Sequence, residues 1–195
     1  QNLLDMYEYR PEDVCVNEAI ANAADAFREN STKNAKIDIT FDKTENNYFI
    51  NFHNDAPPMT EQQFVKKYHT VSFSFKEKGK GIGFAGVGAK IFVVAPEGGE
   101  IITITGKNGK NFLASKMWMT HDDVNYATTK KHPLSKILGK KKYVHKYGTT
   151  YRVRLSDQAY KYLKNGLGAI IQYWWNYGLM SKGFAVTIDG RRLSP

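Results

Sequence analysis

The sequence contains one cysteine, Cys15, and no hydrophobic run that approaches the roughly 20 residues needed to cross a bilayer. A lone cysteine excludes an internal disulfide framework and suits a reducing compartment. The N-terminus lacks a basic stretch followed by an apolar segment, so no signal peptide is recognised. We therefore expect a cytoplasmic protein without a membrane segment, in which Cys15 is a small core residue.

The composition also excludes a disordered chain, because 42% of the residues are hydrophobic and 13% are aromatic. A length of 195 residues fits one domain, with residues 156–195 as a C-terminal helical and strand extension. The chain starts at Gln1 and stops at Pro195, just after a strand-like segment, so we expect part of a longer protein. The formal charge of +9 suits nucleic acid, nucleotides or other acidic partners.

Hydrophobic periodicity and turn residues predict an α+β fold, a two-layer sandwich with a mixed sheet and helices on one face. The predicted strands are residues 36–42, 48–53, 100–105, 110–119, 149–155 and 185–188. Helices are predicted at residues 11–30, 60–68, 87–94 and 156–177, the last of them interrupted by Gly166 and Gly168. The segments between, residues 69–86 and the basic residues 120–146, are predicted as loops.

The first helix carries a polar stripe made by Glu18, Asn22 and Asp25. Its opposite face is apolar and should pack on the sheet, at positions 16, 20, 23 and 27. A carboxylate one turn from a carboxamide suits a water-activating base next to a metal ligand. A solvated helix face is the alternative interpretation of the same stripe.

Residues 76–90, KEKGKGIGFAGVGAK, form a glycine-rich loop that leads into a helix. Glycines at this density let backbone amides turn toward a phosphate, and the helix N-terminus favours an anion. The Walker signature fails because Ala89, not lysine, follows Gly88. The dinucleotide fingerprint is disfavoured because no strand immediately precedes the loop. A flexible surface loop remains the alternative.

Three segments resemble, in family order, the motifs of the GHKL ATPases, which include DNA gyrase, heat-shock chaperones, histidine kinases and MutL. They are residues 17–26 (NEAIANAADA), 83–89 (GFAGVGA) and 148–149 (GT). The resemblance implies a Bergerat ATP-binding fold, Mg²⁺-dependent ATP binding and hydrolysis, and an ATP-driven conformational or dimerisation switch. Histidine kinases usually lack a glutamate at the position of Glu18, so its presence points to a hydrolase.

The resemblance also implies roles for single residues. Glu18 would polarise the attacking water, Asn22 would complete the coordination of Mg²⁺, and Asp25 would support the pocket. Thr149 would donate toward the adenine edge. The lid that wraps the triphosphate would consist of Gly83, Phe84, Ala85, Gly86, Val87 and Gly88, and Lys90 would either reach a phosphate or point into solvent.

The second family motif, Asp-x-Gly-x-Gly-Met, is altered here. Residues 54–60 read NDAPPMT, which retains Met59 but places Asn54 where the family aspartate accepts a hydrogen bond from the adenine amino group. The asparagine carbonyl can still accept that bond, at a cost of about 1 kcal/mol, or a register shift lets Asp55 serve. Because this motif departs from the family pattern, a nucleotide-binding or sensing module without turnover remains an alternative function. A rigid turn formed by the two prolines, without any ligand, remains an alternative interpretation of the segment itself.

The partner of such a switch is not specified by the motifs. Seven lysines between residues 130 and 146 suit DNA, as in the topoisomerases and MutL, and equally suit a solvated loop. The family resemblance implies an ATP-dependent homodimer of a longer protein.

Overall fold

The computed structural model describes residues 10–64, 99–107, 112–120, 123–128, 133–139 and 142–195. These residues form one eight-stranded sheet in the order β5-β4-β3-β6-β2-β1-β7-β8. The strands are β1 (Lys36–Lys43), β2 (Tyr48–Asn54), β3 (Glu100–Lys107), β4 (Leu113–Thr120), β5 (Asp123–Thr128), β6 (Tyr147–Leu155), β7 (Ala185–Ile188) and β8 (Arg191–Arg192). The helices are α1 (Pro11–Glu29), α3 (Leu134–Leu138) and α4 (Asp157–Met180), and residues 61–64 are also helical.

The sheet is mixed, which confirms the predicted α+β class. Strand β1 pairs parallel with β7 and antiparallel with β2. Strand β6 lies between β2 and β3 and pairs antiparallel with both, although it follows them in sequence. The last strands thus join a sheet begun by the first ones, so residues 156–195 belong to the same folding unit as the rest.

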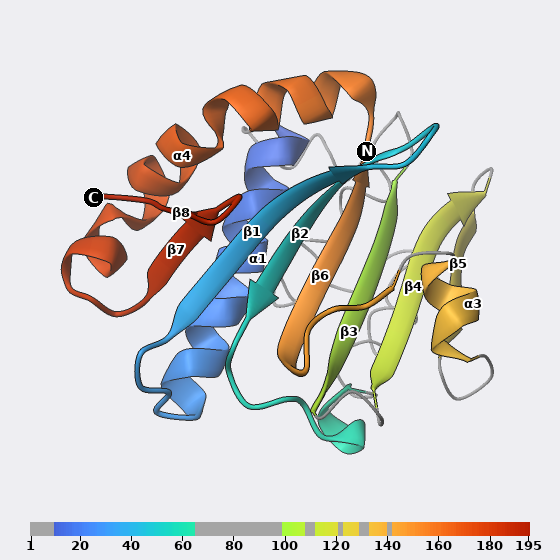
Figure 1. Ribbon diagram of the computed structural model, residues 1–195, viewed down its shortest axis with the longest axis horizontal. Coiled ribbons are helices and arrows are strands. Elements are labelled where there is room, and N and C mark those ends of the chain that lie inside the picture. The colour runs from blue at the N-terminus through green and yellow to red at the C-terminus, as the bar shows by residue number, and fades with distance from the viewer. Residues whose placement is uncertain (1–9, 65–98, 108–111, 121–122, 129–132, 140–141) are drawn as a thin grey trace, which may run out of the picture.

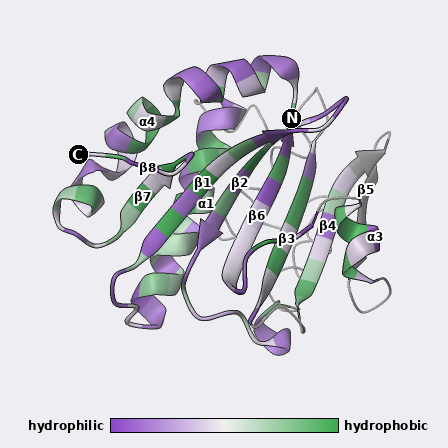
Figure 2. Cartoon of the chain, in the orientation of Figure 1, coloured by the Kyte–Doolittle hydropathy of each residue, from purple (hydrophilic) through white to green (hydrophobic). Residues whose placement is uncertain are grey.

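The two long helices pack on one face of the sheet, as predicted (Figure 1). Helix α1 begins at Pro11, where the missing N–H costs nothing, and its apolar face is buried through Val16, Ile20 and Ala23. In helix α4, the Ser156 hydroxyl accepts a hydrogen bond from the Ala159 N–H at 3.1 Å, so the predicted N-cap is confirmed. Figure 2 shows hydrophobic and hydrophilic residues alternating along both helices.

These faces meet the sheet in one main core. Alternate residues of the central strands enter it, including Ile39 of β1, Phe52 of β2 and Val153 of β6. The helices contribute Ile20 and Leu163. The alternation that predicted the strands therefore also determines which strand residues face α1.

Helix α4 runs without a break through Gly166 and Gly168, so the predicted interruption is wrong. A helical glycine costs about 1 kcal/mol relative to alanine. Leu163, Leu167 and Ile171, one turn apart, are all buried in the main core. Burying each of them contributes about 1.5–3 kcal/mol, which outweighs the two glycines.

The segment predicted as a basic loop, residues 120–146, contains strand β5 and helix α3. Helix α3 lies on the sheet face opposite α1, which differs from the prediction that helices cover one face only. Ile137 anchors α3 in a second, smaller core with Ile102, Ile104 and Ala114. Lysines dominate the composition of this segment, so the sequence pattern did not indicate that Ile137 is buried.

Two further local predictions concern turns and membranes. The predicted capping box is confirmed, because the Gln63 N–H donates to the Thr60 hydroxyl at 3.2 Å and the Thr60 N–H donates to the Gln63 side chain at 2.9 Å. Every helix among the described residues is too short or too polar to span a bilayer.

Two glycine substitutions should change stability in opposite directions. Gly148 has a φ of 102°, and a Cβ there would lie 2.1 Å from the Asn54 carbonyl oxygen. We expect Gly148→Ala to lower the free energy of unfolding by about 2–4 kcal/mol. Gly166 is helical, with nothing within 4 Å of an added Cβ, so Gly166→Ala should raise it by about 0.5–1 kcal/mol. Urea unfolding of both variants measures the difference, and equal effects would contradict the close contact.

Candidate functional site

Two predicted site residues meet at one end of the sheet. Asn54, the last residue of β2, is the cross-strand partner of Thr149 in β6. Both are buried, with 4% and 5% of their surface exposed. Each lies two residues from a main-core aromatic, Phe52 or Tyr151, so both face the side covered by α1. Residues predicted from separate motifs to contact one ligand are therefore neighbours.

Thr105 joins this pair to the turn that follows β2. Its hydroxyl accepts a hydrogen bond from the Met59 N–H at 2.9 Å and lies 2.9 Å from the Thr149 hydroxyl. Thr105 is the partner of Thr149 across the β3–β6 ladder and is fully buried. Thr105 was not among the predicted site residues, although threonines that alternate with isoleucines at 102 and 104 indicate a polar position on one face of the strand.

The turn after β2 is fixed by its own side chains. The Asn54 side-chain oxygen accepts a hydrogen bond from the Ala56 N–H at 3.3 Å. The Asp55 carboxylate accepts one from the Lys36 N–H at 2.9 Å, which ties the turn to the start of β1. These are the backbone-capping bonds that Asn and Asp favour in turns. The second oxygen of the Asp55 carboxylate stays available, so the alternative in which Asp55 replaces Asn54 at the ligand stays a prediction.

The polar stripe of α1 is only partly exposed. Glu18 and Asn22 are half-buried, and within the described residues neither side chain has a hydrogen-bond partner. Asp25 differs, because it is exposed and forms an ion pair with Arg28 at 2.9 Å. Within the described residues, the Glu18 and Asn22 side chains are therefore not engaged by the protein, whereas Asp25 is.

Burial raises the pKa of the Glu18 carboxyl, and the nearby Asp25 carboxylate raises it further. A carboxylate whose pKa is raised accepts a proton more readily, as a general base must. The neighbours of the stripe along α1, Ala19 and Ala23, pack in the same core as Tyr151. Helix α1 therefore packs on the same side of the sheet as Asn54 and Thr149.

A magnesium ion needs only one or two protein oxygens when a triphosphate supplies the others. The carboxamide oxygen of Asn22 is such a ligand, and it has no competing partner in the described part of the chain. No group of three or more His, Cys, Asp or Glu that could hold a metal ion occurs among the described residues.

The predicted lid, with Gly83, Phe84, Ala85, Gly86, Val87, Gly88 and Lys90, lies outside the described residues. Its contact with a nucleotide stays a prediction.

No family model and no curated protein matches the chain.

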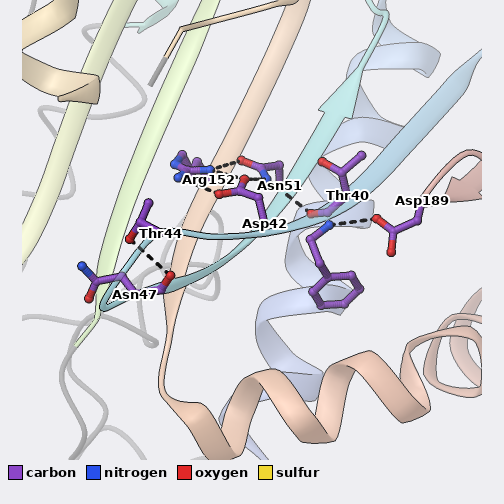
Figure 3. Close-up of polar contacts among 8 residues, drawn as sticks. Thr40, Asp42, Thr44, Asn47, Asn51, Arg152 and Asp189 are labelled. Carbon is purple, nitrogen blue, oxygen red and sulfur yellow. Dashed lines mark hydrogen bonds and ion pairs between the residues drawn. The ribbon is translucent and has the colours of Figure 1, made fainter. Parts of the chain in front are cut away.

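A different polar network occupies the sheet face opposite α1 (Figure 3). The buried Arg152 guanidinium donates to the Asp42 carboxylate at 2.5 Å and to the Asn51 side-chain oxygen at 2.9 Å. It also lies 3.6 Å from the centre of the Phe49 ring. Asn51 in turn donates to Asp42 at 2.7 Å. Because the charge is paired and hydrogen-bonded within the protein, the charged groups of this network are satisfied without a ligand.

A histidine pair lies next to this network. The rings of His53 and His145 stack with centroids 3.6 Å apart. His53 Nδ1 is 2.8 Å from the Thr150 hydroxyl, which also contacts the Tyr143 hydroxyl at 2.9 Å. A shallow concavity of about 70 Å³ is lined here by Thr40, Asn51, Tyr143, His145, Thr150 and Arg152. Sequence spacing gave no signal for the pair, because residues 53 and 145 meet only through the β2–β6 pairing and the segment before β6.

The histidine pair predicts a loss of stability in acid. Burial, and next the neighbouring His145, lower the pKa of His53 from 6.5 to about 4, although Asp38 opposes the shift. The unfolded chain therefore binds more protons between these pH values. As the pH falls from 6.5 toward 4, the free energy of unfolding should decrease by about 1.4 kcal/mol per pH unit. The total loss from His53 alone should be about 3 kcal/mol.

Urea unfolding at pH 7, 6 and 5 measures this slope. His53→Asn retains an oxygen that can contact Thr150 but removes the titrating ring, so its stability should depend less on pH than that of the wild type. Identical slopes for the two proteins would contradict the assignment.

Proposed function

We propose that this chain is a GHKL-type ATP-binding domain with a Bergerat fold, which binds ATP with Mg²⁺ and hydrolyses it. The observation that carries the proposal is the arrangement of two polar sets beside one core. Glu18 and Asn22 are half-buried on α1 without partners in the described residues, and Asn54 and Thr149 are paired at the end of the sheet. The motif order in the sequence supports the same assignment.

In this proposal, the adenine base of ATP lies at the end of the sheet where Asn54 and Thr149 pair. The Thr149 hydroxyl and the Asn54 amide offer polar contacts there, and the partly buried Met59 offers an apolar surface. Thr105 positions two of these groups, because its hydroxyl bonds to the Met59 N–H and contacts the Thr149 hydroxyl. A largely apolar site with a few fixed polar groups is typical of small-molecule recognition.

Helix α1 serves the phosphate end. Bound Mg²⁺ would neutralise phosphate charge, with Asn22 as its protein ligand. Glu18 orients the attacking water and accepts its proton, and its raised pKa favours that transfer. The resemblance implies that residues 83–90 would wrap the triphosphate with their backbone amides, in keeping with the glycine spacing.

The family resemblance supports a role as a switch, in which ATP drives a conformational change or dimerisation of a longer protein. The slow hydrolysis expected of such a domain resets the switch. Whether DNA is the partner depends on the lysines at residues 130–146, most of which lie outside the described residues.

Removing the proton acceptor should abolish turnover but not binding. We expect Glu18→Gln to lower kcat for ATP hydrolysis by about 10²–10⁴-fold. The melting temperature of the same variant should still rise when ATP and Mg²⁺ are added, because the amide retains the shape of the side chain. Phosphate release and thermal shift measure the two effects separately.

Glu29→Gln, at the exposed end of the same helix, is the matched control and should leave hydrolysis unchanged. Asn22→Ala should weaken the Mg²⁺-dependent part of the thermal shift. Hydrolysis that persists in Glu18→Gln would refute the role of Glu18. A thermal shift without phosphate release in the wild type would favour a nucleotide-binding module without turnover.

A further inference from the structure

The pairing of Arg152 with Asp42 and Asn51 balances its charge but leaves two of its N–H donors unused. Nη1 donates to Asp42 at 2.5 Å and to Asn51 at 2.9 Å, and Nη2 donates to Asp42 at 3.1 Å (Figure 3). Because a guanidinium carries five N–H donors, the Nε–H and the second N–H of Nη2 have no acceptor within the described residues. These two donors lie side by side on one edge of the planar group, as the fork that binds a carboxylate or a phosphate.

This unused fork belongs to a side chain that is almost fully enclosed. Arg152 is 4% exposed, and the Phe49 ring covers one face of its guanidinium. In the described part of the chain, the enclosed polar side-chain atoms without a partner are Thr32 Oγ1 and Asn176 Oδ1, so Arg152 Nε keeps access to solvent. An arginine held in place by its own partners loses little side-chain entropy when it binds a ligand.

Arg152 meets solvent in the concavity on the sheet face opposite α1. Arg152 lines this concavity and Asp42 does not, so the guanidinium reaches it with an edge other than the one paired with Asp42. No described residue of the lining is acidic. Because Asp42 balances the charge of Arg152, the exposed Lys142 supplies the net positive charge of the lining, which favours an anion.

The rest of the lining indicates the kind of anion. Ile104, Leu138 and Val144 give the concavity an apolar wall. Its volume of about 70 Å³ holds about five water-sized positions, which suits a ligand of about five heavy atoms. A carboxylate with a short hydrocarbon chain can place its oxygens on the fork and its chain against the wall. Inorganic phosphate would instead turn polar oxygens toward the wall, where they lose hydration.

We propose that this concavity binds a small organic carboxylate. Nε and Nη2 of Arg152 hold its two oxygens, Lys142 contributes a second positive charge, and the apolar wall takes the hydrocarbon part. The site lies on the sheet face opposite α1, so it is separate from the proposed nucleotide site and does not depend on the proposed function.

Propionate is the probe, because it joins a carboxylate to a two-carbon chain. The isotope-labelled full chain would be titrated with sodium propionate and followed by NMR, without nucleotide and at constant ionic strength. We expect saturable shifts of the amides near Thr150 and Arg152, with a dissociation constant on the order of 1 mM. Propionamide has the same shape without the charge and should give no saturable shift.

Two variants test the residues that carry the proposal. Arg152→Lys retains the charge but has no fork, so it should weaken propionate binding about tenfold or more. Because a buried substitution can disturb the fold, Lys142→Gln tests the site through an exposed residue and should weaken binding about two- to fivefold. Lys182→Gln removes the same charge just after α4 and is the matched control, with an unchanged dissociation constant.

Three results would overturn the inference. The first is a wild type in which propionate and propionamide cause the same shifts. The second is tighter binding of inorganic phosphate than of propionate. The third is an equal loss of binding in Lys142→Gln and Lys182→Gln, which would indicate a non-specific attraction of anions to a basic chain. None of these results bears on ATP hydrolysis, which Glu18→Gln tests separately.

Discussion

The close approach of Gly148 to the carbonyl oxygen of Asn54 is the contact on which the candidate site depends. No side chain fits there, because an added Cβ would lie 2.1 Å from that oxygen. The approach lets β6 start alongside the last residue of β2, so that Thr149 lies opposite Asn54. The pairing of β6 with β3 then places Thr105 beside Thr149. One glycine thus allows three strands to bring their polar residues to one end of the sheet.

The two faces of the sheet use polar residues in different ways. On the face opposite α1, Arg152 is paired with Asp42 and Asn51, and the buried His53 contacts Thr150. These groups satisfy one another, as stable buried polar networks must. On the α1 side, Glu18 and the Asn54 amide lack such partners among the described residues. The two faces thus differ in how far the polar side chains of the described residues are paired with one another.

The turn after β2 is held by the side chain of the residue that opens it. Asn54 caps the turn through its oxygen, which accepts from the Ala56 N–H. An aspartate could cap the turn equally well, so the fold does not require the asparagine. The choice between them affects only the second terminal atom, which accepts in one residue and donates in the other.

The sequence by itself determined the strands whose side chains alternate, the caps at Thr60 and Ser156, and the polar stripe of Glu18 and Asn22. These features depend on residues close together in the chain, where period, turn chemistry and propensity act directly. The continuity of α4 through Gly166 was not predictable in this way, because it depends on burial against the sheet.

Only the tertiary structure decided that Thr105 joins Met59 to Thr149, that His53 stacks on His145, and that α3 covers the second face of the sheet. It also decided which end of the Asn54 amide faces the turn. Each of these depends on strand order and register, which bring together residues far apart in the chain. Local sequence patterns carry no information about that pairing until the sheet is assembled.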